Sequence, residues 1–141
     1  CIYYGDEAGM EGCADPFCRR TYPWGHEDAQ MLARYQAMTA MRNAHPVLRT
    51  GECVYLAPCA DVLGVIRTNE SGRDAFGSQA ENACAVTLIN RSAKEVVVYL
   101  TAEDVCGAKT FVTDDGQTLS ARGGAFSVKV KGLQGMTGFA E

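Results

Sequence analysis

The sequence lacks any apolar run near the roughly 20 residues of a membrane-spanning helix, and it has no excess of basic residues. Its 13 Lys and Arg are outnumbered by 17 Asp and Glu, and the net charge of −4 disfavours a protein that binds nucleic-acid phosphates. With 4 prolines and 15 glycines in 141 residues there is no collagen-like or low-complexity bias. The 47% of hydrophobic residues is enough for a core. The composition indicates a soluble, mildly acidic globular protein with neither a nucleic acid nor a membrane as partner.

The cysteines are odd in number, so at least one thiol is unpaired. We interpret them as small buried hydrophobic residues in a reducing, cytoplasmic protein, with scattered disulfides as the alternative. A signal peptide is not expected, because residue 1 already lies in an apolar, strand-like run. The seven residues are Cys1, Cys13, Cys18, Cys53, Cys59, Cys84 and Cys106.

Residues 1–5 form a continuous apolar and aromatic run that ends at a glycine. Such a run predicts a strand buried on both faces of a parallel sheet, and that strand needs neighbours which do not precede it here. We therefore expect the chain to begin within a larger unit. A glycine-rich and proline-containing loop follows over 6–25, and apolar residues spaced by three and four predict a helix over 27–44. His45-Pro46 ends that helix.

From Gly51 onward, apolar residues tend to recur at every second position. Short strands separated by turn residues at near-regular intervals predict an antiparallel β-sandwich or barrel over 51–141. The expected strands are Cys53–Ala57, Val62–Thr68, Cys84–Asn90, Val96–Thr101, Lys109–Thr113, Phe126–Val130 and Met136–Phe139.

Most candidate catalytic and metal-binding groups fail on spacing. Asp6 and Glu7 are adjacent, and adjacent side chains on an extended chain point to opposite faces, so the two cannot flank one glycosidic bond. Cys13, Cys18 and His26 lack the close cysteine spacing and the fourth ligand of a zinc site. No glycine-rich phosphate loop and no catalytic triad are present. We expect no cofactor and no metal.

A polar and aromatic set in the loop is better suited to binding. Asp15 and two arginines, Arg19 and Arg20, lie near Phe17, Tyr22 and Trp24. A carboxylate accepts from sugar hydroxyls, a guanidinium donates in a fork, and an aromatic ring covers the apolar face of a sugar. The alternative is an Asp–Arg ion pair that only stabilises the loop, and the residues alone leave both open.

The runs Ile2-Tyr3-Tyr4-Gly5-Asp6-Glu7-Ala8-Gly9-Met10-Glu11-Gly12, Asp15-Pro16-Phe17-Cys18-Arg19-Arg20 and Pro23-Trp24 resemble the C-terminal end of the α-amylase-family glycoside hydrolases. The resemblance is to the neopullulanase, cyclomaltodextrinase and maltogenic amylase branch. It implies that residues 1–50 are the last strand, a substrate loop and the last helix of a (β/α)8 barrel. It implies a Greek-key β-sandwich for residues 51–141.

The resemblance also implies a function. The parent would be a retaining hydrolase of α-1,4, and in some members α-1,6, glucosidic bonds in maltooligosaccharides, cyclodextrins or pullulan. Its catalytic carboxylates follow earlier barrel strands, so none is expected here and the chain alone would be inactive. Asp15 and Arg19 match the pair that holds a glucose unit, with Glu7, Arg20 and Trp24 as supporting residues.

Two other functions stay open, and both are non-catalytic. The β-sandwich would be a carbohydrate-binding module or a purely structural domain. The module is poorly supported, because residues 51–141 contain no Trp. The apolar stripe of residues 29–44 would pack on barrel strands, so we expect the isolated chain to self-associate.

Overall fold

The residues after Gly51, whose apolar positions alternate, form a β-rich domain that contains all of the predicted strands. In the computed structural model, which describes residues 1–141, only β6 has no counterpart among them. With three residues, β6 is too short to show an alternating pattern. The strands are β1 (Glu52–Cys59), β2 (Val62–Asn69), β3 (Ala83–Asn90), β4 (Val96–Thr101), β5 (Thr110–Thr113), β6 (Thr118–Ser120), β7 (Ala125–Val130) and β8 (Gly135–Ala140).

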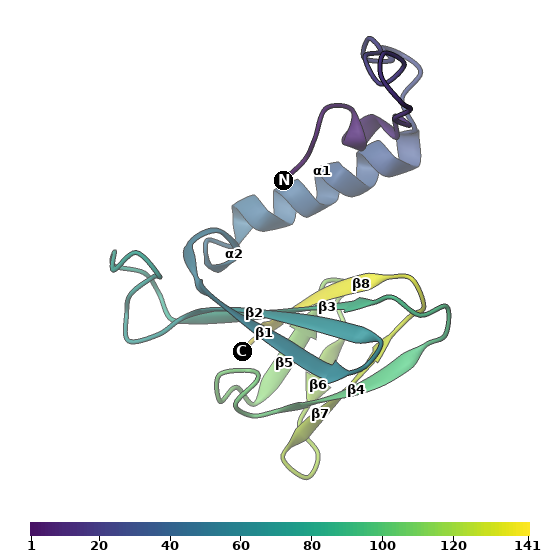
Figure 1. Cartoon of the computed structure of the whole chain (residues 1–141). Helices are drawn as coiled ribbons and strands as arrows, with labels where there is room; N and C mark the ends of the chain where they lie inside the picture. The colour runs from purple at the N-terminus through teal and green to yellow at the C-terminus, as the bar shows by residue number, and fades with distance from the viewer. The chain divides into compact units, whose positions relative to one another are not determined.

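These strands form two antiparallel sheets. The larger sheet has six strands in the order β1-β2-β3-β8-β5-β6, and the smaller one pairs β4 with β7 (Figure 1). The chain therefore crosses repeatedly from one sheet to the other, and β8 inserts between β3 and β5. The predicted sandwich of antiparallel strands is confirmed.

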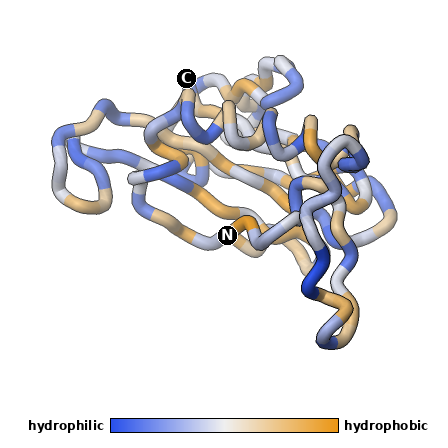
Figure 2. The backbone as a smooth tube through the Cα atoms, turned by 90° about the horizontal axis from the view of Figure 1, so that it is seen from above, coloured by the Kyte–Doolittle hydropathy of each residue, from blue (hydrophilic) through white to orange (hydrophobic).

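Inward-facing side chains from both sheets fill one core. The Phe111 ring on β5 and the Phe126 ring on β7 are both fully buried, with their centroids 6.3 Å apart. Figure 2 colours the backbone by hydropathy and shows hydrophobic and hydrophilic segments interspersed along the chain. The core residues are Val62, Ile66, Cys84, Val86, Leu88, Val98, Leu100, Val105, Phe111, Phe126, Val128 and Val130.

One glycine on β8 is required by this packing. A Cβ built on Gly138 would overlap Cζ and Cε1 of the Phe111 ring and lie 3.0 Å from its Cε2. The Phe111 ring is itself enclosed, so it has little room to move. Only a residue without a side chain fits between β3 and β5 at this place.

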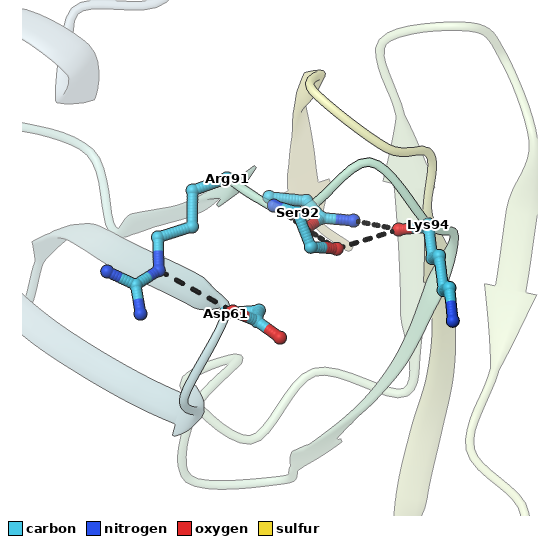
Figure 3. Close-up of polar contacts among 5 residues, drawn as sticks. Asp61, Arg91, Ser92 and Lys94 are labelled. Atoms are coloured by element: carbon cyan, nitrogen blue, oxygen red, sulfur yellow. Dashed lines mark hydrogen bonds and ion pairs between the residues drawn. The ribbon is translucent and has the colours of Figure 1, made fainter.

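A buried asparagine organises the turn between β3 and β4. Asn90 is 1% exposed, and its amide nitrogen donates to the carbonyls of Lys94, Val130 and Lys131 at 2.8, 3.0 and 3.3 Å. Its side-chain oxygen accepts from both the backbone N–H and the hydroxyl of Ser92, at 2.9 Å each. The Lys94 carbonyl lies 3.0 Å from the same Ser92 hydroxyl, so it shares the hydroxyl proton with the Asn90 oxygen (Figure 3). The side chain of one residue thus joins the end of β3, the start of β4 and the end of β7.

The first compact unit, residues 1–45, contains η1 (Asp6–Ala8) and the helix α1 (Ala29–Ala44). The carboxylate of Asp28 accepts from the N–H groups of Gln30 and Met31 at 2.9 Å, which explains why α1 begins two residues later than the apolar pattern suggests. Neither α1 nor any other helix combines the length and the apolar character needed to span a bilayer.

The second unit, residues 46–141, begins with the single-turn helix α2 (Val47–Thr50). Val47 is buried, and α2 packs against β2 and β3. The structural division therefore falls between His45 and Pro46, slightly before the boundary at residue 50 that the change of period suggests. The reason is that the apolar face of α2 contributes to the packing of the β-sandwich.

Residues 1–5 are predicted to form a strand, but they form none in this structure. A strand needs hydrogen-bonding neighbours, and no other strand pairs with this segment. The backbone instead turns at Gly5, whose φ is 80°, and the Asp6 carboxylate accepts from the Tyr3 N–H at 2.8 Å. The side chains of Ile2, Tyr3 and Tyr4 are exposed.

Candidate functional site

The long loop between η1 and α1 is held closed at its base. The Asp28 N–H donates to the Ala8 carbonyl at 3.0 Å, which joins the two ends of the loop. Gly9 has a φ of 71°, and a Cβ there would lie 2.9 Å from the Asp28 Cβ. Close approach of the two ends therefore depends on Gly9 and on the residue that caps α1.

Asp15 and Arg19, the predicted sugar-binding pair, lie together in this loop. Arg19 Nε donates to Asp15 Oδ1 at 2.7 Å, and the Arg19 terminal nitrogen lies 3.5 Å from Asp15 Oδ2. Two turn hydrogen bonds set this spacing: Phe17 N–H to the Ala14 carbonyl at 2.9 Å, and Arg19 N–H to the Pro16 carbonyl at 3.0 Å. The arginine side chain is 77% exposed and the aspartate 64%. A pair so exposed stabilises a loop by at most about 1 kcal/mol, but its remaining N–H groups and lone pairs stay open to a ligand.

Arg20 contacts other groups than Asp15 and Arg19 do. Its Nε donates to the Phe17 carbonyl at 3.3 Å, and its terminal nitrogen lies 3.7 Å from the Cys13 sulfur. The Tyr4 hydroxyl donates to the Arg20 carbonyl at 3.2 Å. Arg20 therefore contributes to the shape of the loop, and its guanidinium is not part of the Asp15–Arg19 pair.

Trp24 belongs to an aromatic cluster. Its ring lies 4.6 Å from the Tyr22 ring at 50°, and the Tyr22 ring meets the Tyr4 ring edge-on at 6.4 Å. Trp24 is 80% exposed, so one ring face is available to a ligand. Tyr4 is the member that the sequence did not indicate, because its apolar surroundings placed it in a strand.

Glu7 lies beside this cluster. Partial loss of contact with water raises the pKa of the Tyr22 phenol above its usual value. The negative charges of Glu7 and Glu27 and a side-chain hydrogen bond with Glu7 raise it further. Apart from Arg20, the predicted site residues thus form two groups: the Asp15–Arg19 pair, and Glu7 with the aromatic rings. The hydrogen bonds and ring contacts of the structure do not join one group to the other.

The remaining surface of this unit includes an apolar groove of about 700 Å³ between the N-terminal segment and α1. Ile2, Tyr3, Leu32 and Tyr35 are among the residues that line it. Two methionines of the predicted apolar stripe, Met31 and Met38, are exposed, and α1 has no buried residue. The structure gathers no group of three or more metal-ligating side chains.

Comparison with known proteins gives related sequences but no matching family model. An amylopullulanase from Thermoanaerobacterium saccharolyticum is 32% identical over 139 residues, which is 96% of this chain and 11% of that protein. A cyclomaltodextrinase from a Bacillus species is 45% identical over 78 residues, 54% of this chain and 14% of that protein. The chain thus spans only a small part of the length of these relatives.

Solved structures share the fold. A cyclomaltodextrinase structure covers 100% of this chain with a TM-score of 0.79 at 23% identity, and the match spans 23% of that protein. The α-amylase of Geobacillus thermoleovorans, solved with acarbose, covers 99% with a TM-score of 0.80 at 18% identity, over 29% of its length. AmyP, solved with maltotriose, covers 90% with a TM-score of 0.67 at 16% identity, over 23% of its length.

Proposed function

This chain corresponds to the C-terminal region of α-amylase-family enzymes, and from that premise we propose that it forms part of a retaining α-glucan hydrolase. The enzyme would cleave α-1,4 glucosidic bonds of maltooligosaccharides, cyclodextrins or pullulan. In pullulan it would also cleave α-1,6 bonds. The catalytic carboxylates would come from the remainder of the enzyme. The chain would supply a sugar-binding loop and a stabilising β-sandwich.

The observation that carries the role of the loop is the exposed Asp15–Arg19 pair. The carboxylate and the guanidinium are held side by side at 2.7 Å, with most of both side chains open to solvent. Adjacent hydroxyls of a glucose unit present donors and acceptors at a similar spacing. A preformed pair of this kind binds two hydroxyls without the entropic cost of ordering either side chain.

Replacing Arg19 with Lys tests this role in the enzyme that contains the chain. Lys keeps the charge but loses the planar fork, so we expect the KM for maltooligosaccharides to rise about tenfold, with a smaller change in kcat. Arg91→Lys is the matched control, because Arg91 forms a similarly exposed ion pair with Asp61 at 3.5 Å on the β-sandwich (Figure 3). Equal KM values for the two variants would mean that the Asp15–Arg19 pair only stabilises the loop.

The alternative, a carbohydrate-binding β-sandwich, would depend on exposed aromatic rings. Tyr55 on β1 and Tyr99 on β4 are exposed, but they belong to different sheets and share no ring contact. Phe111 and Phe126 are fully buried. Tyr55 and Tyr99 therefore form no shared aromatic platform, which favours a structural role.

Titration of the 141-residue chain with maltoheptaose separates these functions. We expect weak binding that Asp15→Asn or Arg19→Lys abolishes and that Tyr55→Ala or Tyr99→Ala leaves unchanged. The reverse pattern would favour a binding module.

We also expect no hydrolysis of a chromogenic maltooside by the chain alone, and measurable turnover would overturn the proposal.

Two further properties belong to the same proposal. The exposed apolar residues of the N-terminal segment and α1 favour self-association of the isolated chain, and a monomeric sedimentation profile at all concentrations would contradict this. The interpretation of the cysteines as buried residues is wrong for most of them, because only Cys84 is buried and the other six are exposed. Their free thiols still support the proposal of a reducing, cytoplasmic location. Fractionation of the producing cells tests it, since activity in the culture medium would place the enzyme outside.

A further inference from the structure

Two cysteines far apart in the sequence line one hollow at the end of the β-sandwich where β3 begins. Cys84 on β3 lies directly opposite Thr68 on β2 in the antiparallel register. The Cys106 thiol lies 3.3 Å from the Thr68 hydroxyl, and Cys84 and Cys106 line the same hollow. The proposed sugar-binding loop does not involve either residue.

The backbone holds Cys106 in this position. Its φ of 55° is in the left-handed region, which non-glycine residues rarely adopt, and Gly107 follows with a φ of 77°. The Gly107 N–H donates to the Ala102 carbonyl at 2.7 Å, and the preceding side chain, Val105, is fully buried. The direction of the Cys106 thiol is therefore set by a hydrogen-bonded and anchored turn.

The pair is accessible from one side. Cys106 is exposed, whereas Cys84 is 5% exposed. Both line a hollow of about 420 Å³ that also includes Asn69, whose buried side-chain oxygen has no hydrogen-bond partner. Cys106 is therefore the more accessible of the two thiols, and the Asn69 oxygen is an unpaired acceptor in the lining of the hollow.

We propose that Cys84 and Cys106 form a redox-active dithiol, which a low-molecular-weight disulfide oxidises to an intramolecular disulfide. The Cys106 thiolate attacks one sulfur of the small disulfide, forms a mixed disulfide and releases one small thiol. The Cys84 thiolate then attacks the Cys106 sulfur and releases the second small thiol. Two protein thiols and one small disulfide thus become one protein disulfide and two small thiols.

The order of the two steps follows from the surroundings of each thiol. Burial, and next the hydrogen bond and charge of Cys106, raise the pKa of the Cys84 thiol far above its usual range. A buried thiol with a raised pKa is a poor first nucleophile. Once Cys106 carries the small thiol, Cys84 is the other cysteine that lines the hollow, and the second step is intramolecular.

The disulfide would link β3 of the large sheet to the connection between β4 and β5. Closing a loop of this length restricts the unfolded chain and raises the midpoint of thermal unfolding, on the order of 10 °C. A reductant would reverse the change. The disulfide would thus be a reversible cross-link that stabilises the β-sandwich under oxidising conditions.

Mass mapping of the 141-residue chain after treatment with oxidised glutathione tests the proposal. Trypsin cleaves after Arg73, Arg91, Lys94 and Lys109, so Cys84 and Cys106 lie in separate peptides, 74–91 and 95–109, each with a single cysteine. After acid quenching and alkylation, we expect these two peptides to be joined, with a mass two hydrogens below their sum. Alkylated Cys84 together with glutathione retained on Cys106, or a linkage to another cysteine instead, would overturn the proposal.

Two matched variants keep the test independent of folding artefacts. Cys84→Ser should retain glutathione on the exposed Cys106, and Cys106→Ser should leave Cys84 unmodified. Neither variant should show the reductant-sensitive rise in the unfolding midpoint. A similar rise in either variant would assign it to the other cysteines and contradict the proposed pair.

Discussion

Gly138→Ala is expected to destabilise the β-sandwich by about 3 kcal/mol, although it adds a single methyl group. The new Cβ would overlap the Phe111 ring, which is fully buried and packed against Phe126. Forcing a methyl group into a packed core costs about 1–3 kcal/mol, and more where the neighbour cannot move. For a domain of this size the midpoint of thermal unfolding should fall by roughly 10–20 °C.

The matched control is Gly135→Ala on the same strand. A Cβ at Gly135 would meet the Leu88 carbonyl oxygen at 3.4 Å and an Ile89 side-chain carbon at 3.6 Å, which are ordinary contacts. We expect a change within about 1 kcal/mol for this variant. A double variant, Gly138→Ala with Phe111→Leu, should lose less stability than the two single changes together, because a smaller side chain relieves the overlap. Equal stability of the two alanine variants would refute the close approach.

Asn90→Leu should have a comparable effect by a different mechanism. The leucine would leave the carbonyls of Lys94, Val130 and Lys131 without their shared donor, and Ser92 without its acceptor. An unsatisfied buried polar group costs about 1–3 kcal/mol. We therefore expect the free energy of unfolding to fall by about 3 kcal/mol in urea, measured with the chain kept reduced.

Asn69→Leu is the matched control for this variant. Asn69 is 3% exposed, close to the 1% of Asn90, but its side-chain oxygen has no hydrogen-bond partner. The same substitution there removes an uncompensated polar atom, and it should cost little or even stabilise the domain. If the two leucine variants lose the same stability, then side-chain size decides the effect and the Asn90 hydrogen bonds contribute little.

Several strands of the β-sandwich were predictable because buried and open residues alternate along them. In β7, for example, the buried residues Phe126, Val128 and Val130 alternate with exposed ones. The division into sheets of six and two strands was not predictable, since the same alternation fits either sheet. The hydrogen bonds of Asn90 could not be predicted either, because asparagine is a common residue before a turn.

The candidate site was predictable in part. The spacing of Asp15 and Arg19 indicated a pair, and the structure brings their side chains together. The sequence placed residues 1–5 in a strand from their apolar character, but an apolar run contains no information about whether a partner strand is present. In the structure Tyr4 belongs to no strand, and its hydroxyl donates a hydrogen bond to the Arg20 carbonyl in the loop.

The position of β8 has a consequence for biosynthesis. Its residues, Gly135–Ala140, bridge β3 and β5, so the large sheet consists of two unconnected halves until that segment is available. While the ribosome still covers residues 135–140, the edges of β3 and β5 have unpaired N–H and C=O groups and attract other strands. The nascent β-sandwich therefore completes its fold only after this segment leaves the exit tunnel.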